Sequence, residues 1–119
     1  MKKILGFLLG MTLVASFNVF AVGAIATDDD VGDAEPGYGI ATGFDTKEEA
    51  QKAALKNCRE AGNKNCEVAV WFKGCGAYAS SKEYAGVGWG KTKAIAESKA
   101  KEKCGSAKCT IKVSECDDE

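Results

Sequence analysis

Residues 23–27 read GAIAT and residues 76–80 read GAYAS, and this repetition determines how the rest of the chain is read. Self-similarity at a spacing of tens of residues is typical of a protein built from repeated supersecondary units. One constant shift aligns further pairs: Tyr38 with Tyr84, Thr46 with Thr92, Lys47 with Lys93, Ala50 with Ala96, Ala54 with Ala100 and Cys58 with Cys104. After shorter loops, Cys66 matches Cys109 and Cys75 matches Cys116. We therefore predict two similar units in series, residues 22–75 and 76–116.

Each unit is predicted to fold as strand, strand, helix and strand. Strands are expected at residues 22–27, 38–44, 67–73, 77–81, 84–89 and 110–116, where β-branched and aromatic residues alternate with others. Helices are expected after Asp45 or Thr46, up to about residue 61 and the stop at Gly62, and from Thr92 through Lys103. The apolar positions of the first helix are small (Ala50, Ala53, Ala54 and Cys58), so it can lie close to a sheet.

The strand patterns also predict which side chains point inward. Val68, Val70 and Phe72 are expected on one face of their strand and Trp71 on the other, while Ile111 and Val113 face inward and Lys112 outward. The predicted class is α+β: one disulfide-linked domain over residues 22–119, with a mainly antiparallel sheet, two helices and an acidic tail at 117–119.

Residues 1–21 have the pattern of a secretory signal peptide. Lys2 and Lys3 precede a mostly apolar, uncharged stretch, and Val19 and Ala21 are small residues at the two recognition positions of a cleavage site. An uncleaved membrane anchor is the alternative, but the stretch is short and carries Asn18. Since no cysteine precedes Cys58, a lipid-anchored lipoprotein is excluded. We expect an exported protein, periplasmic or secreted, with no membrane association after cleavage.

The six cysteines of an exported chain predict disulfides. The repeat favours Cys58–Cys66 and Cys104–Cys109, each joining a helix to its following strand. This leaves Cys75–Cys116, two positions read as equivalent, so their bridge is expected to tie the two units together. A cysteine-only zinc site would need paired CxxC spacing, which is absent, and an even count leaves no free catalytic thiol. No metal and no cofactor is expected.

Charge is distributed unevenly, although the formal net charge is only −1. Acidic residues gather near the start of the predicted domain and at residues 117–119, and the former are Asp28, Asp29, Asp30, Asp33 and Glu35. Carboxylates suit calcium, but the spacing of these residues fits no standard calcium-binding loop, so a solvated loop is expected. The second half is rich in lysine, which is read as a solvated helix face or, alternatively, as a patch for a cell-wall polymer or an acidic partner. No recognition motif supports nucleic-acid binding.

The chain has no histidine, which excludes Ser-His-Asp triads, Cys-His pairs and His-ligated zinc. A hydrolase that uses two carboxylates needs no histidine, but no Asp or Glu stands in a distinctive constellation. Residues 85–92 (AGVGWGKT) fit a relaxed phosphate-loop pattern. The first unit fills the same place with YGIATGF at 38–44, without the lysine, so the glycines are read as permitting close contact with a neighbouring strand or helix.

Large aromatic residues are the remaining candidates for function. Core packing is the default role of Tyr38, Trp71, Tyr84 and Trp89. However, Trp71 and Phe72 are consecutive in a strand and point to opposite faces, so one of these two side chains points away from the core. An outward tryptophan beside lysines makes a recognition surface. The candidate partner-binding residues are Trp71, Tyr84, Trp89, Asp28, Asp29, Asp30 and Asp33.

Several phrases resemble a known family. GAIA (23–26), YGIATG (38–43), VAVWFKGCGAYA (68–79) and YAGVGWG (84–90), with alanine-rich helices that end in cysteine, are similar to the bacterial exported domain-of-unknown-function family 4189. The resemblance implies a secreted or periplasmic one-domain protein and no particular activity. The acidic stretch at 28–35 and the acidic tail depart from the pattern.

Together these observations predict a small exported, non-catalytic binding protein, such as an immunity protein or inhibitor. Its partner is expected to be another protein, with a cell-wall polymer as the alternative. A secreted effector that acts on another cell is the second hypothesis, and a carboxylate-based hydrolase is the third.

Overall fold

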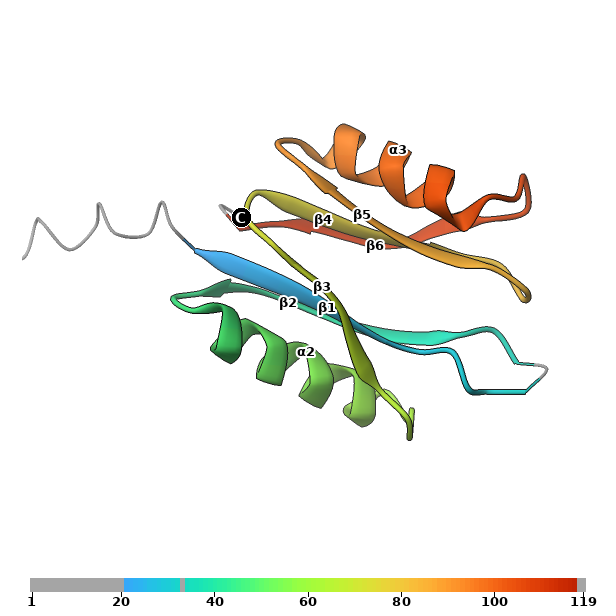
Figure 1. Ribbon diagram of the computed structural model, residues 1–119, viewed down its shortest axis with the longest axis horizontal. Coiled ribbons are helices and arrows are strands. Elements are labelled where there is room, and N and C mark those ends of the chain that lie inside the picture. Colours follow the sequence, from blue (N-terminus) through green and yellow to red (C-terminus); the bar gives the residue numbers. More distant parts are fainter. Residues whose placement is uncertain (1–20, 33, 118–119) are drawn as a thin grey trace, which may run out of the picture.

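The structure, a computed structural model, describes residues 21–32 and 34–117. Its elements are β1 (Val22–Asp28), β2 (Gly37–Phe44), α2 (Lys47–Glu60), β3 (Glu67–Phe72), β4 (Cys75–Ser80), β5 (Ala85–Gly90), α3 (Lys93–Cys104) and β6 (Thr110–Cys116) (Figure 1). The predicted signal peptide lies outside the described residues except for Ala21. Within the described ranges, no helix is long and apolar enough to cross a membrane.

The two units stack as four layers. The first sheet has the strand order β2-β1-β3 and the second β5-β4-β6, and all neighbours are antiparallel. The sheets face each other, with α2 on the outer side of one and α3 on the outer side of the other (Figure 1). This confirms the α+β class and the repeated strand-strand-helix-strand order.

Both helices begin where the sequence predicts. The Thr46 hydroxyl accepts the Glu49 N–H at 3.1 Å, and the Thr92 hydroxyl accepts the Ile95 N–H at 3.2 Å, so each threonine satisfies a free donor of the first turn. α3 ends at Gly105, whose φ of 78° is the left-handed conformation that glycine adopts readily.

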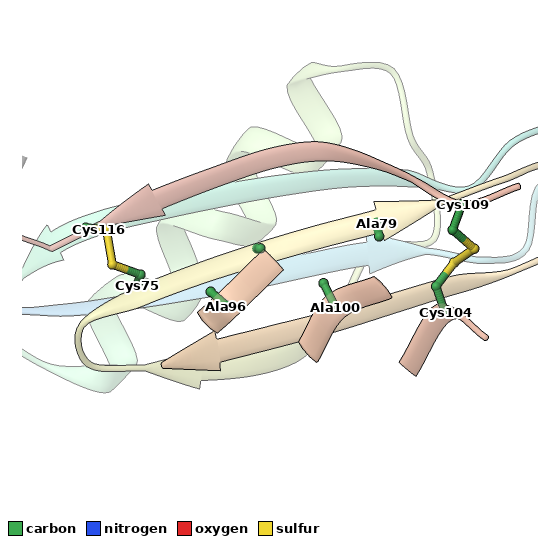
Figure 2. Close-up of a cluster of buried hydrophobic side chains, with 8 residues drawn as sticks. Cys75, Ala79, Ala96, Ala100, Cys104, Cys109 and Cys116 are labelled. Carbon is green, nitrogen blue, oxygen red and sulfur yellow. A yellow bond between two sulfur atoms is a disulfide. The ribbon is translucent and has the colours of Figure 1, made fainter. Parts of the chain in front are cut away.

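Small residues let each helix lie against its sheet. The buried helix residues are Ala50, Ala54 and Cys58 in α2 and Ala96, Ala100 and Cys104 in α3. Figure 2 shows the second of these layers, with Ala96 and Ala100 pointing toward β4. A methyl group on Gly86 or Gly88 would overlap the α3 backbone, and one on Gly39 would overlap α2. The glycines of the phosphate-loop-like stretch thus make room for a helix.

The two sheets share a separate core. Ile25, Phe72 and Tyr78 are its fully buried members, and half-buried aliphatic and aromatic side chains surround them. Gly23 and Gly76, one from each sheet, both lie against the Phe72 ring, which occupies the space that side chains would need. Ile25 and Tyr78 are equivalent positions of the repeat, so the same slot in each unit supplies this core.

Irregularities in two strands change which faces their side chains occupy. Tyr78 pairs with Val113 but Ala79 pairs with Ile111, so β6 carries an extra residue, Lys112. Ile111 therefore packs in the helix-side core and Val113 in the core between the sheets. Both side chains point inward, as predicted, but the extra residue divides them between two different cores.

The equivalent shift in β3 places Val68 opposite Ala26 and Val70 opposite Ile25. Ala26 belongs to the helix-side core and Ile25 to the core between the sheets. Val68 thus lies on the helix side while Val70 and Phe72 lie between the sheets, and the prediction of one shared face was wrong for Val68.

Tyr38 and Tyr84 are not structurally equivalent, contrary to the sequence alignment. Tyr38 pairs with Thr27, whereas Ser80, the counterpart of Thr27, pairs with Ala85. Tyr84 therefore precedes β5. The two units thus differ by one residue in this strand. The pairing of β1 with β2 shifts by one residue opposite Gly23, and this shift lies next to Gly43, whose φ is 85°.

Three disulfides join the cysteines in the pairs that the repeat favours. They are Cys58–Cys66, Cys75–Cys116 and Cys104–Cys109. However, Cys75 is the first residue of β4 and lies directly opposite Cys116 in the second sheet, with a Cα–Cα distance of 3.9 Å (Figure 2). The bridge therefore does not tie the two units together as expected. All three disulfides lie within one unit or the other, and the second unit begins at Cys75.

Candidate functional site

Two exposed tryptophans border one groove where the edges of the two sheets meet. Trp71 of β3 is 43% exposed and Trp89 of β5 is 40% exposed. The groove has a volume of about 640 Å³ and is lined by Ala69, Val70, Trp71, Phe72, Lys73 and Trp89. The structure thus brings together two of the predicted partner-binding residues from different units.

The two rings come from different layers. Trp71 pairs with Ala24, which faces α2, so Trp71 lies on the helix side of β3. Trp89 pairs with Gly76, whose open face lies against Phe72, so Trp89 lies on the inter-sheet side of β5. The groove therefore runs along the edge of β3. Trp71 lines it from the helix side of the first sheet, and Phe72 and Trp89 line it from the side between the sheets.

A lysine lies over each tryptophan ring. Lys47 Nζ is 5.3 Å from the ring centroid of Trp71, and Lys103 Nζ is 5.2 Å from that of Trp89. At these distances the ammonium is attracted to the ring face. Since Lys73 also lines the groove and none of the six lining residues is acidic, the groove is aromatic and positively charged.

The other candidates lie at the opposite end of the strands. A cavity of about 660 Å³ between the 29–36 loop and the β4–β5 turn is lined by Asp29, Val31, Gly32, Ala34, Pro36, Lys82, Glu83, Tyr84 and Ala85. Tyr84 is 51% exposed, and Asp29 and Asp30 are exposed as well. The predicted set therefore divides between two places, and Asp33 lies outside the described residues.

Asp28 is unavailable to a partner, which corrects its place among the candidates. It is only 2% exposed, and its carboxylate accepts the backbone N–H groups of Asn65 at 3.0 Å, Lys64 at 3.1 Å and Asp30 at 2.9 Å. These hydrogen bonds, the one from Asn65 above all, hold the pKa of Asp28 below its usual value. Asp28 thus fastens the end of β1 to the loop before β3.

Sequence reasoning missed a polar cluster that connects the two units. Glu35 in the 29–36 loop accepts a hydrogen bond from the Ser80 hydroxyl at 2.9 Å and lies 2.7 Å from Lys112 Nζ. Lys112, and then Ser80, lower the pKa of Glu35. Ser80 is 1% exposed, so Glu35 supplies the partner that its buried hydroxyl needs. The one available signal was a serine in an otherwise apolar strand.

Tyr78 lies behind this cluster in the core between the sheets. Its side chain is fully buried, and its ring centroid is 5.0 Å from that of Tyr38. Among the described residues, its hydroxyl has no partner in hydrogen-bonding geometry, because the nearby Ser80 hydroxyl bonds to Glu35 instead. Burial raises the pKa of Tyr78 to about 12, so the phenol is neutral at physiological pH.

The profile of a family described as Domain of unknown function (DUF4189) matches residues 22–116. The chain belongs to the DUF4189 family. The match spans both units, so the groove and the polar cluster lie within the DUF4189 domain. Searches of curated proteins and of solved structures find no match.

The chemistry of this DUF4189 domain is limited by its residues. All six cysteines are in disulfides. In residues 21–32 and 34–117, no group of three or more acidic or cysteine side chains is placed to hold a metal ion. Of the accessible cavities in this described part of the chain, the tryptophan groove and the cavity beside Tyr84 are the two that contain predicted partner-binding residues.

Proposed function

We propose that this DUF4189 domain is an exported, non-catalytic binding protein that docks onto a protein partner through the groove between Trp71 and Trp89. The observation that carries the proposal is the convergence of two large, half-exposed rings from separate units on one groove. Tryptophan is enriched among the residues that dominate binding energy in protein interfaces.

The covalent framework supports export. Disulfides persist in oxidising compartments, and this domain has three of them. The predicted signal peptide at residues 1–21 supports the same conclusion. The proposed place of action is therefore the periplasm or the exterior of the cell.

The construction of the groove supports binding without turnover. Each ring projects from a strand, and each has a lysine from the helix of its own unit beside it. Side chains that are already held lose little freedom on binding, which strengthens an interface. Such a surface suits an immunity protein or an inhibitor, which needs tight binding and no chemical step.

Site-specific photo-crosslinking in cells of the organism that produces the protein tests this proposal. A photoreactive amino acid replaces Ala69, an exposed residue of the groove, and in a second strain it replaces Ala107, an exposed alanine in the turn after α3. We expect a discrete protein adduct from position 69 and none of that mass from position 107.

Two double variants test whether the adduct depends on the tryptophans of the groove. The combined change Trp71→Ala and Trp89→Ala should abolish the adduct, while Asp29→Ala and Tyr84→Ala, at the other end of the strands, should leave it unchanged. Circular dichroism melting of each variant checks that it folds. An adduct that survives loss of both tryptophans in a folded protein, or no adduct from position 69, would overturn the proposal.

A further inference from the structure

We infer that the partner places an extended acidic segment in the tryptophan groove, where Lys47, Lys73 and Lys103 bind its carboxylates. This inference rests on the proposed function and names the chemistry of the partner at the same groove.

The charges around the groove support an anionic partner. The three lysines come from α2, from the turn after β3 and from α3. Lys73 lines the groove, and Lys47 and Lys103 lie over the two tryptophan rings that border it. All three are exposed, and none has an ion-pair partner among the described residues. Complementary charges of this kind direct the choice of partner and speed its association.

The position of the lysines on the rings favours carboxylates over sugars. A sugar stacks on the open face of an aromatic ring, but Lys47 covers a face of Trp71 and Lys103 covers a face of Trp89. A carboxylate can hydrogen-bond to the remaining ammonium protons and leave each lysine in place, because an ammonium has three donors. The aliphatic part of an acidic side chain can then pack against the ring edge.

The edge of β3 favours an extended segment. β3 ends the first sheet, so one side of its backbone has no neighbouring strand in that sheet. Next to the groove the strand is regular: Val70, Trp71 and Phe72 pair with Ile25, Ala24 and Gly23 without a shift. A free, regular edge is the surface to which extended peptides add as a further strand.

A binding measurement with defined probes tests the inference. The probe is a fluorescein-labelled peptide of about ten residues in which glutamate alternates with valine, a pattern suited to a strand. The matched control peptide has glutamine in place of every glutamate. Fluorescence anisotropy against the purified protein with its disulfides intact is expected to show binding of the glutamate peptide and at least tenfold weaker binding of the glutamine peptide.

Matched lysine variants locate the contact. We expect the triple change Lys47→Gln, Lys73→Gln and Lys103→Gln to weaken binding of the glutamate peptide about tenfold, since each exposed charge contributes modestly. The triple change Lys52→Gln, Lys56→Gln and Lys101→Gln removes the same charge from exposed positions outside the groove lining and should have no such effect. Melting curves of both variants check folding.

Three results would overturn the inference. They are equal weakening by the two triple variants, equal binding of the two peptides, and preferential binding of polygalacturonate, an anionic glycan, over the glutamate peptide. None of these results removes a photo-crosslinked adduct at position 69. A failure of the acidic-segment inference can therefore be told apart from a failure of the proposed docking function.

Discussion

At the scale of single residues, buried polar groups distinguish the two halves of the repeat. Ile25 and Tyr78 fill equivalent slots, but only Tyr78 carries a hydroxyl into the core between the sheets. Asp28 is buried too, and its carboxylate accepts three backbone N–H groups. A buried group without a partner destabilises the fold, whereas one that is fully bonded fixes the segments around it.

Removing the Tyr78 hydroxyl should therefore stabilise the protein. We expect Tyr78→Phe to raise the free energy of unfolding by about 1 kcal/mol, because an unpaired hydroxyl leaves the core while the ring stays. Urea denaturation followed by circular dichroism measures the change. Tyr38→Phe is the control, since the Tyr38 hydroxyl donates to the Lys112 carbonyl at 3.4 Å and should not stabilise the fold when removed. A lower stability of Tyr78→Phe would contradict the structure.

The two anchored carboxylates predict how stability depends on pH. The pKa values of Asp28 and Glu35 are lowered by folding, so their contribution is complete above their unfolded pKa values. It is lost as pH falls through the lower folded values. We expect the urea concentration at the midpoint of unfolding to decrease as the pH is lowered from about 5 to about 3.

Replacing both carboxylates with amides tests whether Asp28 and Glu35 cause this acid dependence of stability. The double variant Asp28→Asn and Glu35→Gln should be less stable than the parent at neutral pH and should show a weaker fall of the urea midpoint in acid. The variant Asp45→Asn and Glu67→Gln, at two exposed positions, should keep the parent's acid dependence. If the urea midpoint decreased equally with falling pH in the parent and in the Asp28 and Glu35 variant, the loss of stability in acid would belong to other groups.

At the scale of elements, glycine and alanine set the distance between each helix and its sheet. Gly39 and Gly86 occupy the same place in the two units, and both lie against the backbone of the facing helix. The helix faces consist of alanines and cysteines, which extend little from the backbone. Both cores between helix and sheet are thin, so they have no space for an added methyl group at these glycines.

The change Gly86→Ala should be strongly destabilising for this reason. Its methyl group would overlap the backbone of α3 near Cys104 and Ala100, and we expect a loss of about 2–3 kcal/mol as the helix moves away. Chemical denaturation measures the loss. Ser98→Ala, on the exposed face of α3, is the control and should change stability by less than about 0.5 kcal/mol. Near-parental stability of Gly86→Ala would refute the close approach.

The elements themselves could be predicted, but their irregularities could not. Threonine caps, glycine stops and small helix residues are local signals, so both helices and all the strands were expected close to their positions. The extra residues in β3 and β6 depend on how two distant strands pair. A lysine such as Lys112 has the same sequence signature in a regular strand as in a bulge. For this reason the face of Val68 was assigned wrongly, and the separation of Ile111 and Val113 into two cores was not foreseen.

At the scale of the whole molecule, the candidate site exists because two unequal units are stacked. Ser114, opposite Ala77, takes the place that Trp71 occupies opposite Ala24. The repeat therefore does not duplicate the groove. Sequence reasoning could name Trp71 and Trp89 from their residue type and the alternation of Trp71. It could not place them together, because their proximity depends on how β3 and β5 stack.

The disulfide between Cys75 and Cys116 should stabilise the second unit without being needed to join the units. We expect Cys75→Ser with Cys116→Ser to lower the free energy of unfolding by about 2–4 kcal/mol, chiefly by freeing the unfolded chain. Below the unfolding transition the variant should keep its compact size, measured by small-angle X-ray scattering. Expansion under native conditions would show that the bridge does hold the units together.

The placement of all three disulfides within single units has a consequence for how the protein can be divided. Between Phe72 and Cys75 only a short turn links the halves, and Gly74 in that turn has a φ of 90°. Cut there, the chain would yield two fragments, each with its own helix, its own three strands and its own oxidised cysteines. The molecule is then a pseudo-dimer on one polypeptide, suited to fragment complementation and to exchange of halves between copies.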